Sequence, residues 1–133
     1  MRVYIFGNQD VSEDNLVFDV VNKLNGKFKD IEFITVKPNE DVPFVSEKSV
    51  VIMDTVVGID KVEVIEDKDL DKLVLSPRNS AHDFDLGFQL KYLKKLGKLD
   101  KVIIIGLPQQ GEIDYLRIQS ILRKLVAQDI QGS

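Results

Sequence analysis

Runs of hydrophobic residues mark the strands expected in this chain. Two of them, residues 49–54 (SVVIMD) and 101–106 (KVIIIG), are almost unbroken, which suits strands buried on both faces of a sheet. Residues 61–66 (KVEVIE) alternate instead between charged and apolar positions, as expected of an edge strand. The five expected strands are residues 2–7, 31–36, 49–54, 61–66 and 101–106.

Three other segments repeat their apolar residues at the spacing of a helix, so that one side of each would be buried. These expected helices are residues 13–25, 83–96 and 112–128. The order β-α-β-β-β-α-β-α predicts an α/β fold, a three-layer α/β/α sandwich with a mostly parallel central sheet. A length of 133 residues suits a single domain that spans 1–133.

Composition narrows the class of protein. The chain has no cysteine, which excludes disulfides and thiolate metal sites. Its apolar runs are far shorter than the roughly 20 residues that cross a membrane, and no signal peptide is expected at its start. Eighteen basic residues against 22 acidic ones leave a net charge of −4, which indicates no nucleic-acid surface. We therefore expect a cytoplasmic protein that binds neither nucleic acid nor membranes.

Three of the expected strands end in residues that are suited to a site. Ligands of such sheets bind beyond the carboxyl ends of the strands. Asp54 follows an apolar run, where a carboxylate is costly to bury unless it is hydrogen-bonded, paired or bound to a cation. Gly58, four residues later, indicates a turn or a close approach of the backbone to a ligand. The strand ends in question are Gly7-Asn8, Asp54 and Gly106-Leu107-Pro108.

Two acids, Glu13 and Asp14, stand at the expected start of the first helix, after Ser12 as an N-cap residue. Acids in a first turn stabilise the helix dipole, and this role alone accounts for both of them. Either acid could instead point into the cleft at the strand ends and supply an oxygen ligand.

His82 is the one histidine of the chain, and it stands just before the expected helix 83–96. Ser80 and Asp83 have the spacing of a capping box, which puts His82 in the first turn. The positive end of the helix dipole there favours the neutral, metal-binding imidazole, although a surface histidine beside a cap is the simpler alternative. Together, Asp14, Asp54 and His82 would form an open site for a divalent ion such as Zn²⁺ or Ni²⁺.

In their order, these motifs resemble the endopeptidases that mature nickel–iron hydrogenases by trimming a C-terminal extension from the large subunit. The chain departs from that family where Asn15 and Val17 replace two usual glycines after the acid pair. The motifs that carry the resemblance are Gly7-Asn8 followed by Glu13-Asp14, Asp54 with Gly58, Ser80-Ala81-His82, and Gly106 with Pro108.

The resemblance implies that Asp14, Asp54 and His82 are the catalytic residues and contact nickel, with Glu13 as an orienting group. The nickel would arrive inside the large-subunit precursor, which is the expected partner, and zinc or cadmium can take its place in the site. Two alternatives stay open. One is a non-catalytic assembly chaperone that binds the nickel-bearing precursor, and the other is an unrelated α/β domain that binds a small ligand.

Overall fold

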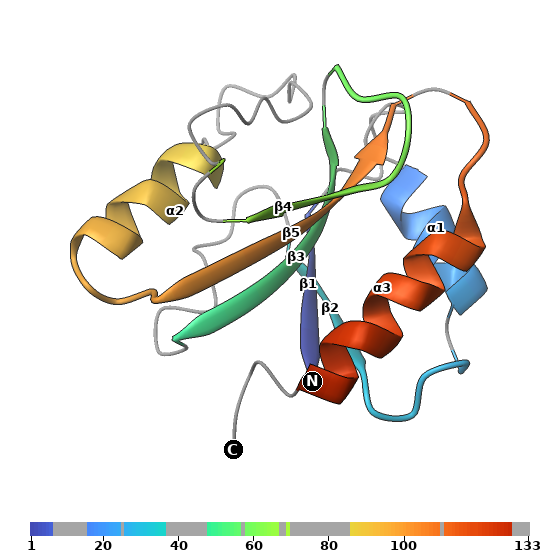
Figure 1. Ribbon diagram of the computed structural model, residues 1–133, viewed down its shortest axis with the longest axis horizontal. Helices are drawn as coiled ribbons and strands as arrows, with labels where there is room; N and C mark the ends of the chain where they lie inside the picture. Colours follow the sequence, from blue (N-terminus) through green and yellow to red (C-terminus); the bar gives the residue numbers. More distant parts are fainter. Residues whose placement is uncertain are drawn as a thin grey trace.

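The computed structural model describes residues 1–6, 16–24, 26–36, 48–56, 58–66, 69, 86–109 and 111–128, with the backbone alone for residues 16 and 86–89. Five strands and three helices lie within these ranges (Figure 1). They are β1 (Arg2–Phe6), α1 (Leu16–Leu24), β2 (Glu32–Val36), β3 (Ser49–Val56), β4 (Glu63–Glu66), α2 (Leu86–Lys95), β5 (Lys101–Pro108) and α3 (Tyr115–Gln128).

The strands form one sheet in the order β2-β1-β3-β5-β4. Three neighbouring pairs are parallel, and only the edge strand β4 runs antiparallel to its neighbour β5. Figure 1 shows α2 on one side of this sheet and both α1 and α3 on the other. The three-layer sandwich with a mostly parallel sheet is therefore confirmed. The edge strand expected at 61–66 is present as β4, which covers Glu63–Glu66.

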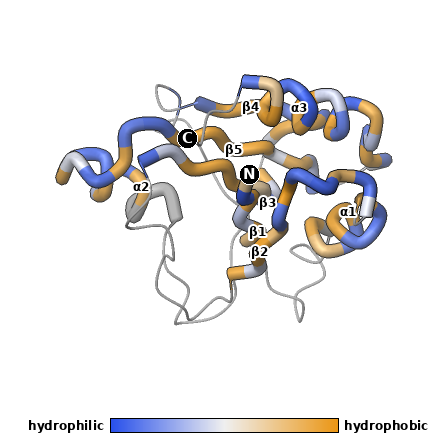
Figure 2. Tube along the Cα trace, turned by 90° about the horizontal axis from the view of Figure 1, so that it is seen from below, coloured by the Kyte–Doolittle hydropathy of each residue, from blue (hydrophilic) through white to orange (hydrophobic). Residues whose placement is uncertain are grey.

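Two hydrophobic layers hold the helices on the sheet. The strands alternate between them, because successive side chains of a strand point to opposite faces. Val51 and Met53 of β3 face α1 and α3, whereas Val50 and Ile52 face α2. In Figure 2 the hydrophobic colour follows β3 and β5 through the middle of the molecule.

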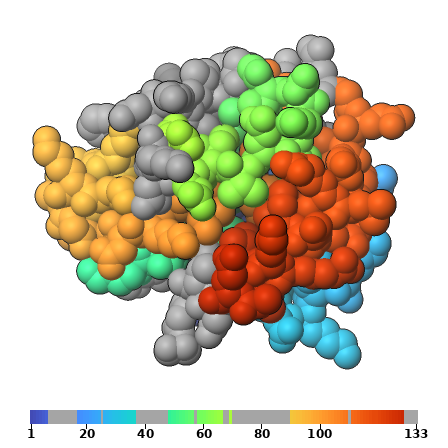
Figure 3. Space-filling model, viewed as in Figure 1, coloured from blue at the N-terminus to red at the C-terminus, as the bar shows by residue number. Residues whose placement is uncertain are grey.

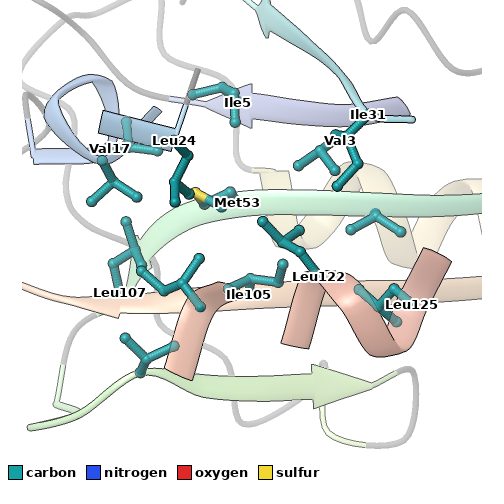
Figure 4. Packing of buried hydrophobic residues seen from close by; sticks show 14 of the residues in the cluster. Val3, Ile5, Val17, Leu24, Ile31, Met53, Ile105, Leu107, Leu122 and Leu125 are labelled. Atoms are coloured by element: carbon teal, nitrogen blue, oxygen red, sulfur yellow. The ribbon is translucent and has the colours of Figure 1, made fainter. Parts of the chain in front are cut away.

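The larger layer lies between the sheet and the helices α1 and α3. Figure 4 shows Leu24 of α1 meeting Met53 of β3, with Leu122 and Leu125 of α3 over the neighbouring part of the sheet. All four side chains are buried. Burying an apolar side chain of this size contributes roughly 1.5–3 kcal/mol, so packing, and not helix propensity, determines where these helices lie.

Several element boundaries differ from those expected, and three of these differences have a clear physical cause. Helix α3 begins at Tyr115 and not at residue 112, because the carboxylate of Asp114 accepts a hydrogen bond from the Arg117 amide at 3.0 Å and caps the helix there. Strands β3 and β5 each continue two residues further than expected, because their register runs on to Val56 opposite Pro108. Asp54 therefore lies inside the paired part of β3, two residues before its last residue, Val56.

Candidate functional site

The strand order places a switch point between β1 and β3. From this point outward, the sheet continues from β1 to β2 on one side and from β3 to β5 and β4 on the other. Crevices at such points, beyond the carboxyl ends of the strands, are where sheets of this kind bind ligands. The register between β1 and β3 ends at Ile5 opposite Met53, so Asp54 is the first residue of β3 beyond it.

Asp54 presents a buried carboxylate at this switch point. Its side chain is fully buried, and its Oδ1 accepts a hydrogen bond of 2.8 Å from the backbone N–H of Thr55. By strand alternation the carboxylate lies on the α2 face of the sheet, with Val50 and Ile52. The hydrogen-bonding role expected for Asp54 is confirmed, and its role as a metal ligand stays a prediction.

Gly106 lies directly across from Asp54 on β5. A Cβ atom on Gly106 would come within 2.8 Å of Val56 Cγ2 and within 3.3 Å of Ile59 Cδ1. The missing side chain therefore makes room for Val56 and Ile59, which pack over the strand beside Asp54. This arrangement gives the site an apolar border.

Gly58 makes the turn that brings Ile59 back over the sheet. Its φ of 89° lies in the left-handed region, and no atom comes within 4 Å of the position that a Cβ would occupy. The glycine is therefore required by the backbone and not by crowding. The turn expected at Gly58 is confirmed.

Thr55 was missed in the sequence-based assignment of the site. It follows Asp54 directly, is fully buried, and points to the opposite face of the sheet, toward α1. Its Oγ1 is the one buried side-chain oxygen or nitrogen for which the described part of the chain offers no hydrogen-bond partner. A polar pair within the apolar run VVIMDTVV is the signal that could have pointed to it.

The other predicted site residues, Glu13, Asp14 and His82, lie outside the described residues, as do Asn8 and Ser80. Their positions in the chain relate them to described elements. Asp14 precedes the first residue of α1 by two positions, and His82 precedes the first residue of α2 by four. In Figure 1 both helices run back from the end of the sheet at which β3 and β5 end. Within the described ranges alone, no three His, Cys, Asp or Glu side chains form a metal-binding group.

A separate groove of about 720 Å³ lies between α3 and the strands β4 and β5. Figure 3 shows these elements side by side on the front of the molecule, with α3 in red and β4 in green. Its lining includes Lys101 and Ile103, from the first half of β5, on the face opposite the Asp54 carboxylate. The groove is therefore distinct from the switch-point site.

Comparison with known structures identifies the fold. The structure of the hydrogenase maturating endopeptidase HybD from E. coli matches with a TM-score of 0.60 at 14% identity, covering 96% of this chain and 94% of that one. The solution structure of an endopeptidase from Escherichia coli matches with a TM-score of 0.56 at 16% identity, covering 96% and 91%. No curated protein sequence matches the chain. Among the described helices, none has the length and apolar character needed to span a membrane.

A family model supplies the assignment that the structural likeness alone does not. The model of the hydrogenase maturation protease family, HycI, matches residues 19–132. The matched region contains Asp54, Gly58, His82 and Gly106, and begins after Asp14. The resemblance drawn from the sequence motifs is thus confirmed, and the chain belongs to the hydrogenase maturation protease family.

Proposed function

We propose that this maturation endopeptidase removes the C-terminal extension of a nickel–iron hydrogenase large-subunit precursor, and does so after nickel has been inserted. The observation that carries the proposal is the buried, oriented carboxylate of Asp54 at the switch point of a sheet that belongs to a protease family. Such a carboxylate is costly to bury and suits a cation that arrives with the substrate.

In this proposal Asp14, Asp54 and His82 contact the nickel of the precursor and act as the catalytic residues. Two carboxylates and one imidazole suit a borderline divalent ion, and three protein ligands leave a position open beside the bond to be cut. The same donor set accepts zinc or cadmium in place of nickel. Glu13 would orient one of the ligands.

The surroundings of Asp54 support such a role. The carboxylate is held by a strand in the middle of the sheet and by the Thr55 amide, so little ordering is needed when the metal arrives. Val56 and Ile59 border the strand beside it with apolar atoms, and charge interactions are stronger where water is excluded. A rigid, dry carboxylate binds a cation better than a mobile, solvated one.

We also propose that processing takes place in the cytoplasm, where a chain without cysteine is at no disadvantage.

The test is the intact mass of a nickel-loaded large-subunit precursor before and after incubation with the protein. Loss of a single C-terminal peptide from the nickel-loaded precursor, with no loss from the nickel-free one, is the expected result. An unchanged mass together with a stable complex would instead identify an assembly chaperone. If the precursor is neither cleaved nor bound, a hydrogenase precursor is excluded as the substrate.

A further inference from the structure

The connection between β3 and β4 lies next to the row of the sheet that contains Asp54. Its residues 58–62 lead to Glu63, the first residue of β4. Glu63 pairs with Gly106 of β5, and Gly106 pairs in turn with Asp54. The connection therefore enters β4 in the same row as the site carboxylate, two strands away from it.

This connection reaches both faces of the sheet. Ile59 lies over Gly106 on the face of the site carboxylate, with its Cδ1 atom 3.3 Å from the position that a Cβ would occupy there. Val62 is 1% exposed and belongs to the hydrophobic layer on the opposite face, which α1 and α3 cover. Only the exposed residues 60–61 separate these two contacts. The place of Ile59 beside the site therefore depends on how firmly Val62 is held.

Arg117 of α3 holds the connection at this point. Its Nε donates a hydrogen bond of 2.6 Å to the backbone carbonyl oxygen of Val62, 55 residues away in the sequence. This carbonyl precedes the ladder of β4 with β5, and the backbone carbonyl of a buried residue requires a partner. A hydrogen bond from a charged donor is also stronger than one between neutral groups. Since Asp114 caps the amide of Arg117 at 3.0 Å, the arginine stands at a fixed point of α3.

We propose that Arg117 is a positioning residue of the endopeptidase site. Through Val62 it holds the connection, so that Ile59 stays packed beside the site and keeps water from the Asp54 carboxylate. Excluding water strengthens the interaction of that carboxylate with a cation. Arg117 acts through the connection alone, because α3 covers the face of the sheet opposite the carboxylate. The proposal deepens the proposed function and rests on it.

Two substitutions of Arg117 separate its hydrogen bond from its charge. Arg117→Met has a carbon atom in the place of Nε and donates no hydrogen bond. Arg117→Gln has an amide N–H donor at the same distance from the backbone, without the charge. Because Arg117 is exposed, neither substitution leaves a cavity in the core. The matched control is Arg123→Met, which removes an exposed arginine further along α3 that contacts Gln119 and Phe28.

Methyl NMR measures how firmly Ile59 is held. In Arg117→Met the order parameter of the Ile59 Cδ1 methyl group should fall and its NOE to the α-protons of Gly106 should weaken. The methyl group of Ile104, which is fully buried, serves as an unchanged reference. Arg117→Gln and Arg123→Met should resemble the natural protein. An unaltered Ile59 methyl group in Arg117→Met would show that the arginine does not hold the connection, and would overturn the proposal.

Processing of the nickel-loaded precursor is the second readout. In Arg117→Met the value of kcat should fall about 3- to 10-fold, the effect of one lost hydrogen bond, with KM unchanged. Arg117→Gln should recover most of this loss, and Arg123→Met should process normally. A raised KM with unchanged kcat would show instead that Arg117 binds the precursor. A loosened Ile59 with unchanged kcat would show that the connection takes no part in the site.

The failure of this inference differs from that of the proposed function. If Asp54→Asn stops processing and Arg117→Met processes at the natural rate, the role of Arg117 is overturned and the site stands. A loss of kcat that Arg117→Gln does not recover would assign the effect to the charge and overturn the role of the hydrogen bond. If the natural protein leaves the precursor uncut, the proposed function falls, and the role of Arg117 falls with it.

Discussion

Asp54 of β3 and Gly106 of β5 are direct cross-strand neighbours, and the Cβ that Gly106 lacks would lie 2.8 Å from Val56 Cγ2. Gly106, beside the buried carboxylate, has no side chain, and this leaves room for Val56 at the end of β3 to pack over the sheet. The acid and the glycine, both picked out as strand-end motifs in the sequence, form one local arrangement.

Replacing Gly106 with alanine should destabilise the protein. The new methyl group would overlap Val56, a short, branched side chain that can turn aside only by changing its χ1 rotamer. Overpacking of this kind costs about 1–3 kcal/mol in free energy of unfolding. Denaturant unfolding of Gly106→Ala measures it. Adding Val56→Ala should recover part of the loss, and a strictly additive double variant would show that the contact is not the cause.

Gly58 should respond differently, because its requirement is for backbone conformation. An alanine there meets no atom within 4 Å but must adopt a φ of 89°, at a cost of about 1 kcal/mol. Asparagine, which tolerates this region better, should cost less than alanine in the same unfolding experiment. Equal stability of the glycine and alanine proteins would contradict this account.

The start of α3 can be tested with two neighbouring acids. Asp114→Ala removes the carboxylate that caps the Arg117 amide and should cost about 0.5–2 kcal/mol. Glu112 is exposed and stands two residues earlier, at the point where the helix was expected to begin. Glu112→Ala is the matched control, and its thermal unfolding should be unchanged. A larger loss of stability in Glu112→Ala than in Asp114→Ala would show that Asp114 is not the cap of this helix.

Asp54→Asn should leave the protein folded and the precursor uncut. The amide oxygen can still accept the hydrogen bond from Thr55, but the negative charge that suits a cation is lost. Circular dichroism checks the fold, and the mass of the nickel-loaded precursor checks the processing. Asp19→Asn, at an exposed position of α1, is the control for loss of one charge and should process normally. Processing by Asp54→Asn at the natural rate would remove Asp54 from the site.

His82→Ala should likewise abolish processing without loss of the fold. The prediction comes from the sequence motif, in which His82 is the one available nitrogen ligand of its kind. His82→Gln, which keeps polarity but binds divalent metals poorly, should be equally inactive. Cleavage of the precursor by either variant would sink the assignment of this residue.

Local patterns were enough to predict most of the fold. The unbroken runs at 49–54 and 101–106 are the central strands, and the alternation at 61–66 is the edge strand. The direction of β4 could also have been inferred, because only six residues separate Val56 from Glu63, too few for the crossover that a parallel strand requires. The strand ends were misplaced because Asp54 and Thr55 look like the close of an apolar run. Pairing with β5, which is a tertiary interaction, carries β3 past them.

The site was predictable only in part, for a similar reason. Asp54, Gly58 and Gly106 stand out as residue types at recognisable spacings, and all three lie within the residues that the family model matches. Thr55 does not stand out, because threonine is an ordinary residue in strands. What distinguishes it is a buried hydroxyl without a described partner, and that depends on how the strand packs.

The single antiparallel strand has a consequence for solubility. A long, flat edge would offer its unpaired backbone groups as a template on which other chains could add strands. One of the two edges of the sheet is β4, which has four residues and a glutamate at each end, Glu63 and Glu66. A second chain that paired there would gain few hydrogen bonds and would bring its backbone against two negative charges. This edge of the sheet therefore offers other chains a poor template for strand addition.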